Sequence, residues 1–292
     1  MKKIFVVFLF IIVVFFYQLI IPYNKIIIEN IIFSFIPSLL PCLIIVNFII
    51  EIDALTFLYH KLNHFKLGRI LYIIIVIIIC SCLGMPSLQF VIFDLYKKNI
   101  IEEESLNNFI YSFGTISFPF LYGVCIYNIS NKLIAILMLI IFYIVNATCL
   151  LLKGFKVNQV NIKLNNCNYM VSLNKAFISS AKTIITIVGT VIFFSLFLFL
   201  LEKIPLPWKW LFEGLIEFSY PMINASKANN FIGYIMIIFI SLYPSLSMII
   251  QSKSINKELK IKKYVSTRII VSTSALIIFI FILKLFNYNI WH

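Results

Sequence analysis

Residues 71–87 read LYIIIVIIICSCLGMPS, an apolar run that is interrupted at Gly84-Met85-Pro86. The run is short for a membrane span, which needs about 20 apolar residues. Proline removes a backbone donor and disrupts the preceding helical turn, and the hydrocarbon offers no water to repair that loss. We therefore predict a helix that breaks at membrane depth. Such breaks are tolerated where they are buried in protein or line a cavity, which is the usual architecture of a transporter site.

The same kind of interruption recurs along the chain, which is 62% hydrophobic and 12% charged with a mean hydropathy of +1.04. Four more prolines lie inside or beside apolar sequence, in Phe35-Ile36-Pro37-Ser38, Phe118-Pro119-Phe120, Tyr220-Pro221-Met222 and Tyr243-Pro244-Ser245. A soluble domain carries about 25% charged residues, so the composition excludes that class. The chain is predicted to be a single transmembrane domain, residues 1–292.

The apolar runs predict an all-α polytopic membrane protein with seven spans. We place the spans at about 4–22, 26–50, 70–84, 133–152, 183–201, 231–250 and 268–286. The first run is followed by bulky Ile20-Ile21-Pro22-Tyr23 rather than a small-residue cleavage site, so it is interpreted as an uncleaved span. Regions 85–132 and 205–230 do not fit as spans, and we expect each to hold a re-entrant hairpin with a broken helix. Pro221 is expected to end the helix that carries Glu213 and Glu217.

The distribution of basic residues predicts the orientation. With the N-terminus inside, the segments before residue 4 and at 51–69, 153–182 and 251–268 hold 16 of the 24 Lys and Arg residues, which supports a cytoplasmic N-terminus in the cell membrane. On this assignment 85–132 begins and ends outside. The net charge of +13 does not indicate nucleic acid, because the basic residues lie in short loops and form no basic face on a folded domain.

Two halves are predicted within the domain. An N-terminal span (1–25) precedes a first half (26–152), a solvated cytoplasmic linker (153–172) and a second half (173–292). Each half contains a Pro-Ser-Leu break, at Pro86 and Pro244, and a hydroxyl-rich proline hairpin, at Pro119 and Pro221. This recurrence is consistent with an inverted repeat, and broken helices at matching positions point to a binding site.

Polar residues beside the breaks are the candidate substrate-binding residues: Pro86, Ser87, Gln89, Ser117, Pro119, Glu217, Ser219, Ser247 and Gln251. Half-helix N-termini suit a carboxylate, and hydroxyl or amide groups complete its shell. A carboxylate at membrane depth is costly and marks ion pathways, so Glu217 is a candidate carrier of a proton or a coupling cation, H⁺ or Na⁺. Three alternatives stay open. The polar groups repair freed backbone groups, Glu217 faces outside water with Glu213, or Gln251 is simply interfacial.

The sequence shows no recognised catalytic motif. There is no His-Glu-x-x-His helix, Gly-x-Ser-x-Gly elbow or phosphate loop, and no cofactor is expected. Five of the six cysteines lie in apolar sequence and are interpreted as small buried hydrophobic residues. The expected partners are the lipid bilayer and a small anionic solute, with a homo-oligomer left open.

The order of the broken motifs resembles a known family. The motifs are Ile36-Pro37-Ser38-Leu39-Leu40-Pro41, Gly84-Met85-Pro86, Pro119-Phe120-Leu121-Tyr122-Gly123, Gly214-Leu215-Ile216-Glu217-Phe218-Ser219 and Leu246-Ser247-Met248-Ile249-Ile250-Gln251. Across residues 30–286 this is similar to the sporulation integral membrane proteins of the YlbJ type, in the nucleoside-recognition or gate-domain superfamily, related in design to concentrative nucleoside transporters. The resemblance implies dipicolinate as cargo, moved from mother cell towards forespore across the mother-cell-derived outer forespore membrane.

The chain departs from the family pattern at its glycines. Where the family tends to have glycine beside the breaks, this sequence has Ser87 or Leu88, Phe118, Pro221 and Pro244-Ser245. Glycine permits positive φ and a close approach of the backbone, so its replacement changes what can reach the site. Two functions therefore stay open: a transporter or transporter subunit for a small anionic metabolite, and a non-transporting membrane scaffold or assembly protein in sporulation.

Overall fold

The computed structural model describes residues 31–285 except 66, 159, 161–166 and 203–208, together with 14, 15, 21, 25 and 27–29. This part of the chain is helical, with one isolated antiparallel bridge between Ile101 and Val157 and no strand. The first predicted span, 4–22, falls almost entirely outside the described residues. The prediction of an all-α membrane protein is confirmed at the level of class.

Four helical segments are long and apolar enough to cross a membrane. They are α9 (Lys132–Lys153), α10 (Tyr169–Glu202), α15 (Ile261–Leu285), and α13 (Phe231–Leu242) continued by α14 (Leu246–Ile255). A fifth candidate joins Ile27–Phe33 to α3 (Ile36–Glu51) through a bend of 49°. The predicted spans 26–50, 133–152, 231–250 and 268–286 coincide with these segments. The predicted span 183–201 lies within α10, which starts earlier, at Tyr169, and so includes the last residues of the predicted linker.

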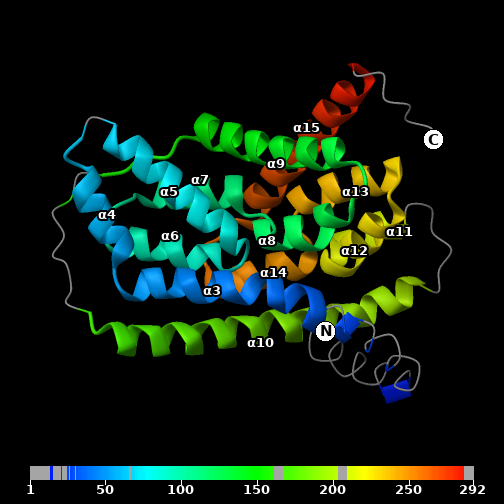
Figure 1. The fold of residues 1–292 in the computed structure, drawn as a ribbon, viewed down its shortest axis with the longest axis horizontal. Coiled ribbons are helices and arrows are strands. Elements are labelled where there is room, and N and C mark those ends of the chain that lie inside the picture. Colours follow the sequence, from blue (N-terminus) through cyan, green and yellow to red (C-terminus); the bar gives the residue numbers. More distant parts are fainter. Residues whose placement is uncertain are drawn as a thin grey trace.

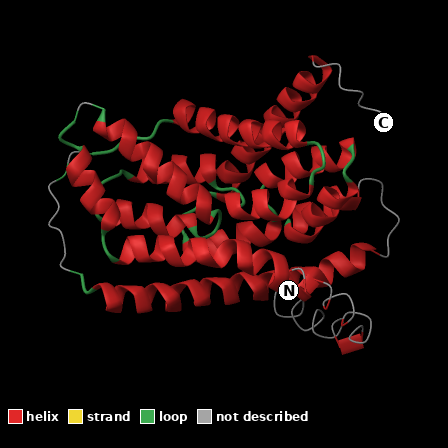
Figure 2. Ribbon diagram, in the orientation of Figure 1, coloured by secondary structure: helices red, strands yellow, loops and turns green. Residues whose placement is uncertain are grey.

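The short helices lie between the long ones (Figure 1). They are α4 (Ala54–Leu62), α5 (Gly68–Leu83), α6 (Leu88–Lys97), α7 (Glu103–Phe113), α8 (Phe118–Phe120) continued by η2 (Leu121–Cys125) and η3 (Ile126–Asn128), α11 (Lys209–Ile216) and α12 (Ser219–Ala228). In Figure 1 α10 runs along one side of the bundle next to α3, and these two helices make extensive contact. Figure 2 shows loop segments at both ends of the bundle and also in its middle, where helices break.

Loops from distant parts of the sequence gather at one end of the bundle, which we call the Lys98 end. Lys98 binds Asp53 there, the backbone N–H of Asn158 donates to Ile100 O (2.8 Å), and the side chain of Asn108 donates to Lys153 O (2.8 Å). At the opposite end, the Asn229 end, the amide of Asn229 donates to Asn128 O (3.1 Å) and accepts from the backbone N–H of Ser130 (3.0 Å). Helices α9 and α10 run between the two ends (Figure 1).

The pair α5–α6 is a hairpin that enters and leaves at the Lys98 end. Helix α5 starts next to α4 and stops at Gly84, and α6 returns to Lys97, beside the Lys98–Asp53 ion pair. The prediction that 70–84 is a span is therefore wrong, because the chain turns back at the break. Region 85–132 was predicted to begin and end on the opposite side from 51–69; its last residues, 128–130, do lie at the Asn229 end, but residues 98–108 contact both 53 and 153–158 at the Lys98 end. The segment from α7 to η3 connects the two ends instead.

The pair α11–α12 is the corresponding hairpin at the Asn229 end. Its chain break is at Glu217-Phe218, and Pro221 lies in the first turn of α12. The prediction that Pro221 ends a helix is wrong. A proline is tolerated in the first turn because the N–H it lacks would have no intrahelical partner there.

Candidate functional site

The first two helix breaks cross each other in direct backbone contact. The N–H of Met85, whose peptide bond to Pro86 is cis, donates to Thr115 O (2.7 Å), and Gly84 has a positive φ of 63°. A Cβ atom at Gly84 would lie 2.3 Å from the backbone N of Ser117. Only glycine allows this approach, so residues 84–87 and 114–117 form one crossing.

Two of the predicted site hydroxyls belong to helix capping. Ser117 precedes α8 and its Oγ accepts from Phe120 N (3.4 Å), with Pro119 in the first turn. At the last break, Ser245 Oγ accepts from Met248 N (3.4 Å) and pairs with Ser247 Oγ (2.8 Å). Such bonds satisfy the first N–H groups of a helix. For Ser117 the structure supports the alternative in which hydroxyls repair freed backbone groups, whereas Ser247 bonds the capping hydroxyl of Ser245.

Glu217 caps the N-terminus of α12. Its Oε2 accepts from Ser219 N (2.9 Å), Ser219 Oγ (2.6 Å) and Tyr220 N (3.3 Å), and the residue is 0% exposed. A carboxylate at this position is stabilised by the unpaired N–H groups and the helix dipole. Glu217 Oε1 has no hydrogen-bond partner among the described residues. Glu213 is also buried and pairs with Lys209 (3.8 Å), so neither carboxylate faces outside water.

Arg268 joins the breaks of the two halves, a role that sequence reasoning missed. Its Nε donates to Leu242 O (2.8 Å) at the end of α13, and its Nη1 donates to Ser112 O (2.6 Å) at the end of α7 and to Asn146 Oδ1 (2.9 Å). Tyr264 OH donates to Gly114 O (2.6 Å) at the same break as Ser112. A cation near helix C-termini is favourable because their carbonyl groups carry partial negative charge.

A signal for Arg268 was present in the sequence. It is one of only two arginines among the 24 basic residues, and it is the first residue of the run 268–286 predicted to span, directly before Ile269-Ile270. Ionisable residues inside spans are rare and mark functional or structural sites. Arg268 was counted with the basic loop 251–268, which hid this signal. In the structure its side chain is completely buried.

Ser87 and Gln89 differ from the capping residues. Both are buried, and Ser87 Oγ, Gln89 Oε1 and Gln89 Nε2 lack a hydrogen-bond partner in the described part of the chain. Buried polar groups are nearly always paired, so each exception calls for an explanation such as water, an ion or a ligand. Backbone repair does not explain these two side chains.

The predicted residues fall into two groups within one continuous region. Pro86 and Gln251 line the same cavity of about 320 Å³, and Ser252 Oγ lies 3.9 Å from Met85 Sδ. Glu217 and Ser219 form a second group, connected to α8 by the rings of Phe218 and Phe120 (5.3 Å between centroids). The structure therefore brings the four breaks together, but Glu217 does not line the cavity that contains Gln251.

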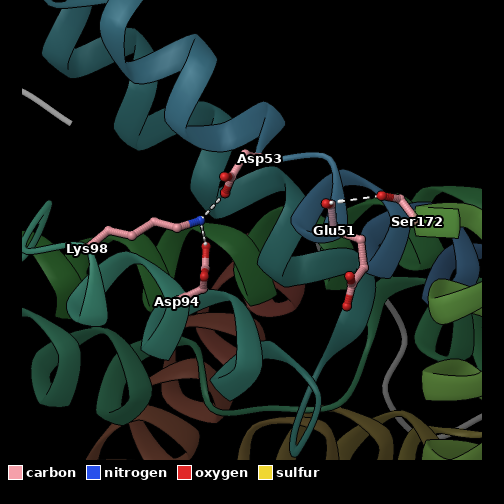
Figure 3. Close-up of polar contacts among 5 residues, drawn as sticks. All are labelled: Glu51, Asp53, Asp94, Lys98 and Ser172. Carbon is pink, nitrogen blue, oxygen red and sulfur yellow. Dashed lines mark hydrogen bonds and ion pairs between the residues drawn. The ribbon is translucent and has the colours of Figure 1, made fainter. Parts of the chain in front are cut away.

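A charged cluster links the end of α6 to the residues before α4 at the Lys98 end (Figure 3). Lys98 Nζ binds Asp53 and Asp94 (2.6 Å), and Ser172 Oγ donates to the backbone O of Glu51 (3.4 Å). Burial alone would lower the pKa of Lys98, but the bonds to the two carboxylates outweigh it and raise the pKa above its ordinary value. Asp94, on α6, is therefore an ion-pair partner of Lys98.

No protein-family model matches the chain, and no curated protein and no solved structure matches it. Among the described residues no group of His, Cys, Asp and Glu side chains is arranged to hold a metal ion. The chemistry available at the breaks is therefore that of helix ends, one guanidinium, one capping carboxylate and several amides and hydroxyls.

Proposed function

We propose that this protein is a membrane transporter, or a transporter subunit, for a small anionic metabolite. The observation that carries the proposal is the meeting of four helix breaks around buried polar side chains, with Arg268 bound to the helix ends of both halves. Irregular backbone at membrane depth is found where it is buried in protein or lines a cavity, and paired broken helices are the usual setting of a substrate site.

The order of elements supports an inverted repeat. In the first half, α3 is followed by the hairpin α5–α6, the broken segment α7–α8 and then α9; in the second, α10 is followed by the hairpin α11–α12, the broken segment α13–α14 and then α15. The first hairpin starts from the Lys98 end and the second from the Asn229 end. The proposal counts six crossings from residue 27 onward, namely the five candidate spans and the broken segment from α7 to η3, and the predicted N-terminal span would be the seventh.

The Lys98 end is proposed to be cytoplasmic, which places the N-terminus inside the cell. Lys97 and Lys98 lie at this end and not on the outer side, where the sequence assignment placed them. The excess of basic residues at the Lys98 end is therefore larger than predicted. The resemblance to sporulation membrane proteins then makes dipicolinate the first solute to test, and the outer forespore membrane the first location. Glu217 is the proposed carrier of a proton or a coupling cation.

Uptake into proteoliposomes tests the proposal. Vesicles containing the purified protein should accumulate labelled dipicolinate in a saturable manner, and Glu217→Gln should abolish uptake while the protein remains folded in the membrane. A deletion strain should form spores with little dipicolinate. Normal spore dipicolinate, or full uptake by the Glu217→Gln variant, would contradict the respective part of the proposal.

One observation favours the scaffold alternative. Phe118, at a position where the resembled family tends to have glycine, packs its ring on Tyr122 (5.7 Å) and near Tyr143 (6.0 Å), so bulky side chains occupy the second break. A scaffold would tolerate substitution of Pro86, Pro119 and Glu217 in sporulation assays. Loss of sporulation from these substitutions, with the protein still in the membrane, would exclude it.

A further inference from the structure

A cavity of about 320 Å³ opens beside the first break, on its Lys98-end side. Helix α10 contributes Ser179, Lys182 and Thr183 to its lining, α14 contributes Gln251 and Ser254, and Pro86 of the break forms part of its wall. Pockets for small ligands have volumes of about 300–1,000 Å³, so the space suits a small solute.

The charge of the lining selects for an anion. Lys182 is the single charged residue that lines the cavity in the described structure, and no carboxylate faces it. Lys182 makes no ion pair within the described residues. Lys253 on α14, by contrast, donates to Leu259 O (2.9 Å) and is committed to the adjoining loop.

The hydrogen bonds that the lining residues already make restrict the chemistry of the ligand further. Thr183 Oγ1 donates to Ser179 O (3.0 Å) and Ser254 Oγ donates to Gln251 O (2.6 Å), so these two hydroxyl protons are used within their own helices. The ammonium of Lys182 and the side-chain amide of Gln251 have no hydrogen-bond acceptor among the described residues. Gln251 is nevertheless buried, with only 7% of its surface exposed. An ammonium and an amide donor together fit a carboxylate, which accepts charge-assisted hydrogen bonds.

We infer that this cavity is a carboxylate-binding subsite on the Lys98-end side of the first break, with Lys182 as its charged donor and Gln251 as its neutral donor. The inference rests on the proposed function and specifies where the anionic solute binds before it reaches the crossing of the breaks. Pro86 links the two places, because it lines the cavity and directly follows Met85, whose N–H bonds to Thr115 O.

Binding to purified protein tests the subsite independently of transport. The probe is pyridine-2,6-dicarboxylate, titrated calorimetrically at low ionic strength, with the uncharged pyridine-2,6-dicarboxamide as its matched control. Lys182→Gln should weaken binding of the dianion roughly tenfold or more, the range expected for a hydrogen bond to a charged group. Lys175→Gln, an exposed position on the same helix outside the cavity, should leave binding unchanged.

The outcomes separate the subsite from the transport proposal. Binding that depends on Lys182 without uptake into vesicles would support the subsite and contradict transport. Uptake with an unchanged KM in Lys182→Gln, or equal binding by the Lys182→Gln and Lys175→Gln proteins, would overturn the subsite and leave transport standing. Binding of the diamide as tightly as the dianion would also overturn it, because charge would then play no part.

Discussion

The crossing of the first two breaks makes a sharp prediction for Gly84→Ala. The new Cβ would lie 2.3 Å from Ser117 N and 2.7 Å from Ile116 C, both backbone atoms that cannot move aside as a side chain would. Gly84 combines φ 63° with ψ 179°, a backbone region open essentially to glycine alone, and holding another residue there costs about 1–3 kcal/mol. Separating the two segments would also lose the hydrogen bond from Met85 N to Thr115 O, worth about 1 kcal/mol. We expect the unfolding free energy to fall by about 3 kcal/mol or more.

Substitutions at two other glycines separate the conformational cost from the cost of the clash with the backbone. Gly154 also has a positive φ, 83°, but a Cβ there meets nothing within 4 Å, so Gly154→Ala should cost only the conformational part, about 1–3 kcal/mol. Gly189 lies inside α10 with open space around it, so Gly189→Ala should stabilise by about 1 kcal/mol through helix propensity. Unfolding of the three variants in mixed micelles of increasing denaturing detergent measures the order. If Gly84→Ala is no less stable than Gly154→Ala, the segments do not cross as closely as described.

Three further predictions concern the buried and paired charges. Arg268→Lys keeps the charge but cannot reach both helix ends, and since each unpaired buried acceptor costs about 1–3 kcal/mol, the same assay should show a loss of about 3 kcal/mol or more; an unchanged transition would exclude the bridging role. Glu217→Gln keeps an oxygen acceptor for the α12 cap and should change stability by less than Glu217→Ala, which should lose about 1–2 kcal/mol; equal losses would argue against capping. Lys98→Met should destabilise at pH 7, whereas the exposed neighbour Lys97→Met should not. Because the folded-state pKa of Lys98 is raised, its contribution should be complete below about pH 10.4 and vanish as the pH rises through the folded-state value; a difference that persists undiminished at higher pH would contradict this.

Helix breaks could be predicted from the sequence because proline acts locally. Breaks were predicted at Pro86, Pro119 and Pro244, and in the structure a short helix begins within two residues of each. Pro221 shows the limit of the signal, since a proline that ends one helix and a proline in the first turn of the next look alike in sequence. The chain break lies four residues earlier, at Glu217, where the capping carboxylate and not the proline marks the start of α12.

The path of the chain after a break could not be predicted in the same way. Hydropathy measures the length of an apolar run, and α5 is apolar from Ile70 to Cys80, so 70–84 was counted as a span. Whether the chain continues or turns back at Gly84 depends on contacts far apart in sequence, such as Lys98 with Asp53 and Asn108 with Lys153. Arg268 was missed for the same reason, because its partners come from α7, α9 and α13.

The buried charges can be explained by the helix ends that the breaks create. Each broken segment brings a helix C-terminus and a helix N-terminus, of opposite partial charge, into the interior. Arg268 binds the C-terminal carbonyls of α7 and α13, and Glu217 binds the N-terminal N–H groups of α12, so each ionised group matches the sign of the end it contacts. Ser117 and Ser245 serve the N-termini of α8 and α14 as neutral caps. Residues that stabilise the ends of the broken helices can therefore be distinguished from residues that are available to bind a solute. Ser87, Gln89 and the cavity residues Lys182 and Gln251 contact no helix end through their side chains in the described structure, which makes them the positions where substitution should change solute recognition without unfolding the protein.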